Sequence, residues 1–317
     1  MTIQNKKIKI SFIGGGNTIQ EHAKVFSTFK EVSMSGIYNR TQKKAQFIAK
    51  NFNIKNAYES VEDLYKKTKS DAVVVAVSVD ATKKICEEIF KYPWICLIEK
   101  PIGYNLSEAI YLEKLAKKYN AKVFAAFNRR HYISTKNLLK KIVKYKGKRL
   151  IEINDQQNQF NLKKIKKRVV SNWMFANSIH LIDYFNILGR GKIKKIKVYN
   201  RWKNKKKCSV FAKILFSSGD VGIYKSLWNS PGLWSVKITT NKKKFELKPL
   251  ERLLFQKVKS KNFKNSNLNY HFDKMFKPGF RNQAYELIKV AKSKKSLLPS
   301  IKDALKTMRL INSIYCR

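Results

Sequence analysis

The sequence of 317 residues is poor in acidic residues, cysteine, proline and glycine, and it has no long apolar run. Its 4 cysteines form no CxxC pair and lie beside no histidine cluster, so we expect neither a metal site nor a disulfide framework. The longest apolar run, residues 72–77, is far shorter than the roughly 20 residues of a membrane span. The N-terminus leads directly into a strand-like segment without a signal-peptide core. We therefore expect a soluble, cytoplasmic protein without a membrane partner.

The shortage of acidic residues leaves a large positive charge. There are 68 lysines and arginines against 21 acidic residues, a formal net charge of +47, and only 11 of the cations are arginines. Such a surplus usually indicates nucleic acid or another polyanion. Here the lysines are spread along the whole chain, and their clusters are not interleaved with aromatic residues as in a single-strand binding surface. We expect solvated lysines and no nucleic-acid partner; an acidic substrate stays open, and salt-dependent binding to nucleic acid would contradict this interpretation.

The length and the apolar content indicate two domains with real cores. Hydrophobic residues make up 44% of the chain, too many for a disordered protein, and domains average roughly 150 residues. In the first part, strand-like and helical segments alternate, which is typical of a doubly wound parallel α/β domain. The strands are expected at residues 8–13, 32–38, 71–77, 95–98 and 122–127, with helices between them. We predict a Rossmann-type dinucleotide-binding domain over residues 1–127.

The second part of the chain has a different pattern. Strand candidates follow one another with little helix between them, at residues 150–155, 193–199, 210–216, 221–225, 234–239 and 244–247. Helices are expected at residues 135–144, 178–188, 280–292 and 301–315. Such a run of strands favours a mostly antiparallel open sheet. We predict an α+β substrate and oligomerisation domain over residues 128–317.

A glycine-containing turn follows the first predicted strand and opens the first helix. The motif is Gly14-x-Gly16-x-x-Ile19, in the context that a dinucleotide fingerprint requires. Gly14 would permit the tight turn, and Gly16 would let the backbone approach a pyrophosphate held by the helix N-terminus, with Asn17 and Thr18 beside it. The third glycine of the fingerprint is replaced by Ile19.

The end of the second predicted strand bears on the choice of cofactor. The residues there are Asn39, Arg40 and Thr41, where an acidic residue would favour NAD. The guanidinium of Arg40 can pair with a 2′-phosphate, and no carboxylate repels that phosphate. We therefore favour NADP(H) over NAD(H). The alternative is that Arg40 is one more exposed cation in a basic chain.

Two further segments carry groups suited to proton transfer. Glu99-Lys100-Pro101 comes directly after a predicted strand, at the sheet edge where ligands bind, and the bond before the proline is a candidate for the cis form. His180 and Asp183 are three residues apart on a predicted helix and so share a face. His180 suits proton transfer near neutral pH; Asp183 either orients it or serves only its own helix.

With these motifs the chain resembles the Gfo/Idh/MocA family of NAD(P)-dependent oxidoreductases, the glucose–fructose oxidoreductase and inositol dehydrogenase group. The resemblance runs over nearly the full length. It is carried by Gly14-x-Gly16, His22-Ala23, Glu99-Lys100-Pro101, Asn128-Arg129-Arg130, His180-x-x-Asp183, Phe216-x-x-Gly219, Trp228-Asn-Ser-Pro231-Gly232 and Lys277-Pro278-Gly279-Phe280-x-x-Gln283.

The resemblance implies hydride transfer between nicotinamide and a secondary-alcohol carbon of a sugar, cyclitol or sugar derivative, with an activated or acidic sugar of surface polysaccharides as one candidate. It implies Lys100 and His180 as the catalytic proton-relay residues and a homo-oligomer formed through the open sheet. Further residues implied at the cofactor are Ser78, Glu99 and Lys100, and those implied at the substrate are Asn128, Arg130, Trp173, Asn177 and His180.

The chain also departs from the family pattern. Many members carry an aspartate four residues before the catalytic histidine, where this chain has Ala176, and the usual Pro and His after the fourth strand are Ser78 and Thr82. With Ile19, these departures support a second hypothesis, a catalytically inactive nucleotide-binding sensor or scaffold of the same fold. For single residues, we expect His22 to pack rather than catalyse, and Arg129 or Arg130 either to bind an anion or to form a structural ion pair.

Overall fold

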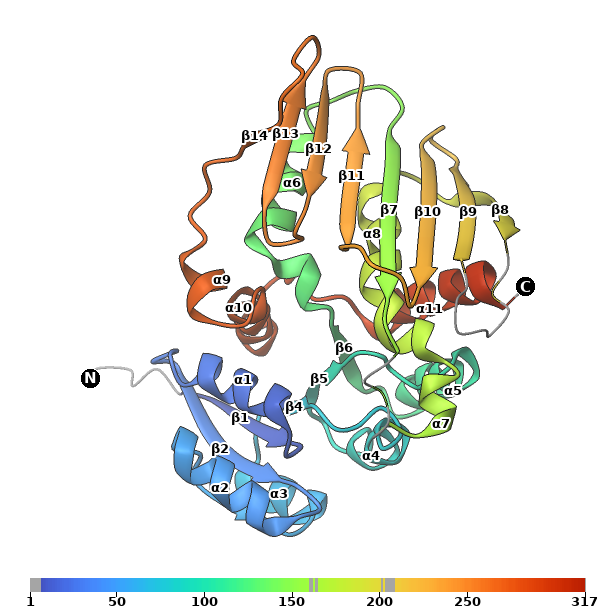
Figure 1. Ribbon diagram of the computed structural model, residues 1–317. Coiled ribbons are helices and arrows are strands. Elements are labelled where there is room, and N and C mark those ends of the chain that lie inside the picture. Colours follow the sequence, from blue (N-terminus) through green and yellow to red (C-terminus); the bar gives the residue numbers. More distant parts are fainter. Residues whose placement is uncertain (1–6, 160–161, 163–164, 201, 203–208, 317) are drawn as a thin grey trace. The chain divides into compact units, whose positions relative to one another are not determined.

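The computed structural model describes residues 7–159, 162, 165–200, 202 and 209–316, which divide into two compact units (Figure 1). The first unit runs as far as Asn128 and also contains Phe272–Leu305. The second contains Arg129–His271 and the residues from Lys306 onward. The division expected from the sequence, 1–127 and 128–317, differs in one segment, because Phe272–Leu305 packs with the first unit.

The first unit is built on a parallel sheet in the order β3-β2-β1-β4-β5-β6. Its strands are short. All residues of β4 are buried, as expected for the central strand of a sheet that is covered on both faces. The order reverses at β1, which lies between β2 and β4. The strands are β1 (Ile8–Ile13), β2 (Val32–Tyr38), β3 (Ala57–Tyr58), β4 (Ala72–Val75), β5 (Ile95–Glu99) and β6 (Lys122–Ala126).

Helices connect these strands, as the alternating pattern predicts. They are α1 (Asn17–Phe26), α2 (Gln42–Phe52), α3 (Val61–Thr68), α4 (Thr82–Ile89) and α5 (Leu106–Lys118). Two of them have side-chain N-caps: Ser60 accepts from the backbone of Asp63, and Asn105 accepts from that of Glu108. Such caps satisfy amides that the first helical turn leaves unpaired. The doubly wound α/β fold expected for this part is confirmed.

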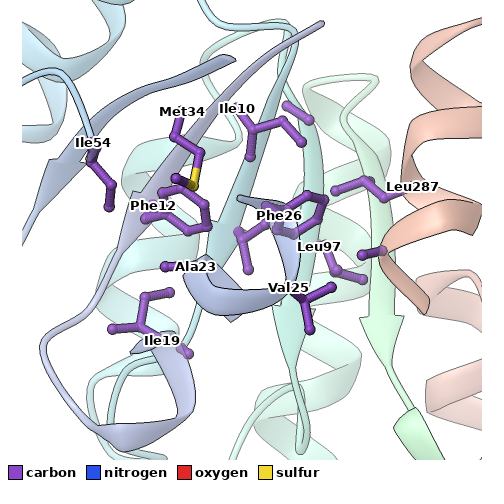
Figure 2. Close-up of a cluster of buried hydrophobic side chains, with 14 of the residues drawn as sticks. Ile10, Phe12, Ile19, Ala23, Val25, Phe26, Met34, Ile54, Leu97 and Leu287 are labelled. Atoms are coloured by element: carbon purple, nitrogen blue, oxygen red, sulfur yellow. The ribbon is translucent and has the colours of Figure 1, made fainter. Parts of the chain in front are cut away.

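The core of the first unit explains why a C-terminal segment returns to it. Helix α10 (Phe280–Ala291) packs against α1. Its Leu287 enters the same buried cluster as Phe12 and Phe26, whose rings meet edge to face at 6.0 Å between centroids (Figure 2). The chain after α10 then joins the sheet edge, where Ala125 N donates to Pro299 O at 2.8 Å. Burial of these apolar side chains stabilises the unit by about 25 cal/mol per Å².

The second unit is built on a sheet in the order β14-β13-β12-β11-β7-β10-β9-β8. All neighbours are antiparallel except β7 and β10, which run parallel, so the mostly antiparallel sheet expected from the sequence is confirmed. Strands β9 and β10 form a hairpin whose turn lies at residues 216–221. The strands are β7 (Leu150–Gln157), β8 (Ile193–Asn200), β9 (Ser209–Phe216), β10 (Val221–Trp228), β11 (Ser235–Thr239), β12 (Lys243–Leu247), β13 (Leu253–Lys257) and β14 (Lys264–Asn265).

Helix α8 (Ile179–Leu188) packs on β7 and β11 of this sheet and is buried on nearly all sides. A π-helical turn, Met174–Ser178, leads into it, and such turns are frequent at functional sites. The remaining helices are α6 (Ile133–Ile142), α7 (Lys167–Val170), α9 (His271–Met275) and α11 (Ile301–Tyr315). In the described part of the chain, no helix is long and apolar enough to cross a membrane.

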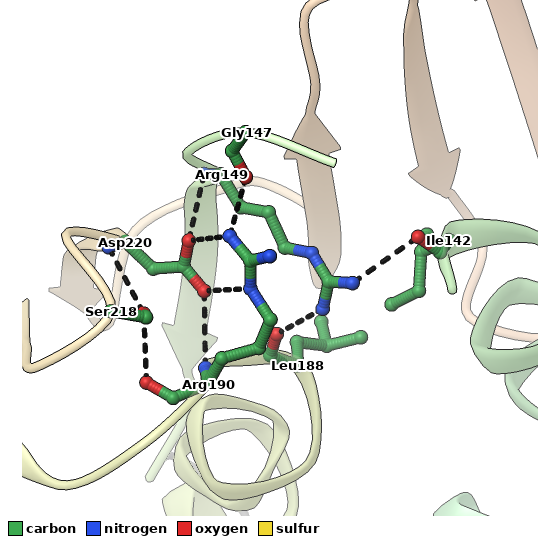
Figure 3. Close-up of polar contacts among 7 residues, drawn as sticks. All are labelled: Ile142, Gly147, Arg149, Leu188, Arg190, Ser218 and Asp220. Atoms are coloured by element: carbon green, nitrogen blue, oxygen red, sulfur yellow. Dashed lines mark hydrogen bonds and ion pairs between the residues drawn. The ribbon is translucent and has the colours of Figure 1, made fainter. Parts of the chain in front are cut away.

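One buried carboxylate fastens the end of α8 to the β9–β10 hairpin (Figure 3). Asp220 is fully buried and accepts from the Arg190 guanidinium at 2.6 and 2.9 Å and from the backbone N–H of Arg149 at 2.9 Å. Burial alone would raise the pKa of Asp220, but the hydrogen bonds from Arg190 and Arg149 and the Arg190 charge outweigh it, so the pKa is lowered. Its ionised form therefore stabilises the second unit.

We expect Asp220→Asn to lower the free energy of unfolding by about 1–3 kcal/mol, because the buried position loses its charge-assisted hydrogen bonds from Arg190. Since the folded pKa lies below the unfolded value, this stabilisation is present above the unfolded pKa and is lost as pH falls through the folded one. The variant should lose less stability on acidification than the wild type. Urea unfolding followed by tryptophan fluorescence measures both effects, with Glu59→Gln, an exposed change of equal charge, as the control. Equal acid sensitivity of variant and wild type would contradict the assignment.

Candidate cofactor and substrate sites

In the first unit, every predicted cofactor residue lies at or after the carboxyl end of a parallel strand. Parallel strands bring these ends to one edge of the sheet, and the reversal of strand order at β1 is where dinucleotides bind in such folds. These residues are Gly14–Ile19 after β1, Asn39–Thr41 after β2, Ser78 after β4, and Glu99 and Lys100 at the end of β5; Asn128, predicted at the substrate, follows β6.

The two fingerprint glycines have different roles in the turn after β1. Gly14 has φ +140°, and a Cβ there would lie 2.2 Å from the carbonyl oxygen of Ala76, so only glycine fits between β1 and the end of β4. At Gly16 a Cβ would meet nothing within 4 Å. The turn therefore holds its backbone close to the neighbouring strand on one side and leaves open space over Gly16 on the other.

The N-terminus of α1 suits an anionic group. Gly16 is its N-cap and provides no side-chain cap, and no acidic residue lies in the first turn. The first-turn amides of Asn17, Thr18 and Ile19 and the positive end of the helix dipole are thus available to phosphate oxygens. The Ile19 side chain is fully buried in the core (Figure 2), so any contact from this residue comes from its backbone. The residues present fit a dinucleotide pyrophosphate.

The loop after β2 carries the residues predicted to contact the adenosine end of a dinucleotide. Asn39 Nδ2 donates to Thr41 O at 3.0 Å, which holds its side chain against Gly15, where a Cβ would come within 2.7 Å of it. Arg40 is exposed at the start of this loop, and α2 begins with Thr41 as a backbone N-cap. An exposed guanidinium beside an uncapped helix start fits a 2′-phosphate, although exposure alone also fits the alternative of a solvated cation.

Glu99, at the end of β5, is held by the buried side chain of His22. The His22 Nε2 and Glu99 Oε1 atoms are 2.9 Å apart, and the imidazole, 1% exposed, packs on the Phe280 ring at 4.5 Å between centroids. The packing role expected for His22 is therefore observed. Since Lys100 follows Glu99 directly, this contact connects α1 and α10 to the segment that carries Lys100.

The same carboxyl edge of the parallel sheet carries a cis peptide bond and a buried asparagine. The Lys100–Pro101 peptide bond is cis, as the sequence suggested. Asn128 is 5% exposed and its Nδ2 donates to Pro278 O at 3.1 Å, so its amide also ties the end of β6 to the turn before α10. A substrate contact of Asn128 stays a prediction.

We expect His22→Phe to destabilise the protein by about 1–3 kcal/mol, because the ring contact with Phe280 survives while the Glu99 carboxylate loses its partner. In a Glu99→Ala background the same change should cost about 1 kcal/mol less, since no carboxylate is left unpaired. Urea unfolding of the four proteins measures this coupling. Additive effects of the two substitutions would contradict an energetic contribution from the contact.

In the second unit, His180 lies at the start of α8 within an aromatic and cationic cluster. It is 7% exposed, and its ring centroid is 6.3 Å from that of Trp234. The Arg129 guanidinium carbon lies 4.8 Å from the centre of the Trp234 ring, a cation–π contact. Trp234 Nε1 donates to Gln156 O at 2.7 Å, which fixes the indole. Trp173, expected at the substrate, is half-buried just before the π-helical turn.

Arg130 and Asp183 form a bidentate ion pair in this unit. Arg130 Nε and Nη2 donate to the two carboxylate oxygens at 2.6 Å each, and Thr307 Oγ1 donates to Asp183 Oδ1 at 2.8 Å. A structural ion pair, one of the two roles expected for Arg130, is thus observed. Asp183 anchors its own helix to α11 through Thr307, while a substrate contact of Arg130 stays a prediction.

A buried chain of polar side chains runs inward from Asn177, in the π-helical turn. Asn177 Nδ2 donates to Gln157 Oε1 at 2.8 Å, and Gln157 Nε2 donates to Asp155 Oδ1. Tyr224 OH donates to Asp155 Oδ2 at 2.6 Å and lies 2.7 Å from Tyr315 OH. Asp155 is fully buried; burial raises its pKa, and the hydrogen bonds that it accepts oppose this.

Sequence reasoning missed Asp155, Gln157, Tyr224 and Trp234. A signal existed in β7, where alternation places Asp155 and Gln157 on the same buried face as Ile151 and Ile153. Polar residues at inward positions of a strand require partners, so they indicate a buried network. Among the residues that the structure describes, no cluster of three or more His, Cys, Asp or Glu side chains is arranged to hold a metal ion.

Comparison with known proteins agrees with this architecture. Residues 8–127 match the Gfo/Idh/MocA model, described as an oxidoreductase family with an NAD-binding Rossmann fold. The first unit is thus similar to the nucleotide-binding domain of this family. Glucose-6-phosphate 3-dehydrogenase of Bacillus subtilis (strain 168) is 30% identical over 135 residues, which are 43% of this chain but only 37% of that relative.

Solved structures share the fold of this chain over nearly its whole length. UDP-N-acetylglucosamine 3-dehydrogenase from Acidithiobacillus ferrooxidans has a TM-score of 0.79 at 14% identity, covering 98% of this chain and 97% of that one. A dehydrogenase from Chromobacterium violaceum has a TM-score of 0.84 at 15% identity, covering 98% and 94%. At such identities the likeness shows the two-domain fold.

Proposed function

We propose that this protein is an NADP(H)-dependent oxidoreductase that transfers a hydride to or from a secondary-alcohol carbon of a sugar, cyclitol or sugar derivative. The observation that carries the proposal is the open turn at Gly16, where an uncapped helix N-terminus meets the reversal of strand order in a Gfo/Idh/MocA domain. Backbone amides there suit a pyrophosphate. The nicotinamide cofactor supplies the hydride chemistry when it is bound.

The choice of NADP(H) rests on the loop after β2. Arg40 is exposed where the adenosine ribose of such a cofactor is expected, and the neighbouring Asn39 and Thr41 are uncharged. The guanidinium would pair with the 2′-phosphate through its fork of donors.

The proton of the substrate hydroxyl is assigned to Lys100 and His180. Lys100 follows the Glu99 carboxylate at the end of β5, and its ammonium can donate a proton. His180 lies buried at the start of α8, and an imidazole is suited to proton transfer near neutral pH. Asn177 and Trp173 would orient the sugar, the first by hydrogen bonding and the second by stacking.

The substrate class is supported by the relatives, which are named for oxidation of a sugar phosphate and a nucleotide sugar. The strongly cationic surface of the protein suits such an anionic sugar. The proposal includes a role in the synthesis of surface polysaccharides. A homo-oligomer formed through the sheet of the second unit and a cytoplasmic location complete the proposal.

The rival function is a nucleotide-binding sensor without catalysis, which Ala176 favours because its methyl group cannot accept a proton.

Titration with NADPH and NADH, followed by nicotinamide fluorescence, tests the cofactor. We expect tighter binding of NADPH, and we expect Arg40→Ala to weaken NADPH binding about 10- to 100-fold while changing NADH binding by about twofold at most. Arg309→Ala, at another exposed arginine, is the control. An equal effect of Arg40→Ala on both cofactors would overturn the assignment of the 2′-phosphate.

Turnover tests the reaction. With glucose 6-phosphate, UDP-N-acetylglucosamine and myo-inositol as probes, Lys100→Ala and His180→Ala should each lower kcat by about 100- to 10,000-fold, and both variants should still bind NADPH. The exposed Lys91→Ala and His271→Ala serve as matched controls. Unchanged turnover in both variants would refute the catalytic assignment, and tight NADPH binding without turnover of any sugar in a broad panel would favour the sensor.

A further inference from the structure

The polar chain that ends at Asn177 has a direction, and its inner end sets that direction. Asp155 and Gln157 are 0% and 1% exposed, whereas Asn177 is partly exposed. An ionised carboxylate only accepts hydrogen bonds, while each amide has a donating and an accepting end. At Asp155 both carboxylate oxygens accept, one from Gln157 Nε2 and the other from Tyr224 OH.

The direction passes from one amide to the next. Because Gln157 must turn its NH₂ group toward Asp155, its carbonyl oxygen faces Asn177. Asn177 must then donate through Nδ2, and its Oδ1 is the end that points away from Gln157. Reversing either amide would place an oxygen against an oxygen in a buried setting, where an unmade hydrogen bond costs about 1–3 kcal/mol.

We propose that Asp155, through Gln157, fixes the Asn177 amide so that its carbonyl oxygen is presented to a hydrogen-bond donor of the substrate, either a sugar hydroxyl or an amide N–H. The substrate part rests on the proposed function; the polarity of the chain does not. Asp155 is then a positioning residue for specificity, although it touches no substrate. Asp155 also provides a buried carboxylate that is linked through Gln157 to the π-helical turn, in which Ala176 directly precedes Asn177.

A stability cycle tests the polarity without any substrate. A carboxylate in place of the Asn177 amide cannot donate, so Asn177→Asp should lower Tm by about 2–4 °C and cost more than Asn177→Ala. In an Asp155→Asn background the chain can reverse, because the new amide can donate to Gln157, and Gln157 can then donate to the new carboxylate. There, Asn177→Asp should cost less than half as much. Asn267→Asp, at an exposed position of the same unit, controls for the added negative charge, which in this cationic protein favours the folded state.

Each outcome of the cycle is decisive. Equal losses of Tm from Asn177→Asp in both backgrounds would overturn the proposal. If Asp155→Asn does not fold, the comparison of Asn177→Asp with Asn177→Ala decides, since a carboxylate variant as stable as the alanine variant also overturns it.

Kinetics test the role in specificity. With the sugar probe that the wild type turns over best, Asp155→Asn should raise KM about 10-fold and change kcat little, because binding orientation is lost rather than proton transfer. In the wild type, replacing the contacted donor by hydrogen or O-methyl should raise KM similarly, and this loss should shrink in the variant. An undiminished loss would overturn the substrate contact. Absence of turnover in the wild type would count against the proposed function alone, because the stability cycle still decides the polarity.

Discussion

The close approach of Gly14 to the carbonyl oxygen of Ala76 is the constraint on which the nucleotide-binding unit depends. A side chain at Gly14 would overlap that oxygen, so the first turn can pass so close to β4 only without a Cβ. The approach directs the chain from the end of β1 into α1, whose N-terminus stays open at Gly16. Apolar packing then holds the helix in place, because Ile19, Ala23 and Phe26 are fully buried in the core beneath it. The close contact at Gly14 and the core beneath α1 together position the helix N-terminus, where backbone amides can bind an anion.

The second unit uses polar groups where the first uses close backbone packing. Among the carboxylates that it buries are Asp183 and Asp155, and each accepts from several donors. Buried charges are costly unless paired, and their hydrogen bonds are directional, so such groups specify geometry more than they add stability. The bidentate ion pair with Arg130 and the directed chain to Asn177 both come from this property.

Sequence patterns predicted the architecture well, because strands, helices and glycine turns are determined mainly by residues that are close together in the sequence. The continuous β-branched run at residues 71–77 became the buried strand β4, and the motif at Gly14 became the turn expected of it. Partners distant in sequence were not predictable in the same way. Asp155 meets Tyr224 only because β7 and β10 are neighbours, and the two-residue strands β3 and β14 are too short for a periodic signal. The return of Phe272–Leu305 to the first unit was likewise missed, since helix amphipathicity does not say which surface a helix will cover.

That return has a consequence for synthesis of the protein. The first unit combines β1 and α1 with α10, which follows β14 in the sequence, so a ribosome has made almost the whole second unit before α10 emerges. Until then Phe26 and its apolar neighbours lack the cover that Leu287 and Phe280 later give. Incomplete domains with exposed apolar surface are the species that aggregate or engage chaperones. The nascent chain therefore carries its nucleotide-binding unit unfinished through nearly all of the time in which the second unit is made.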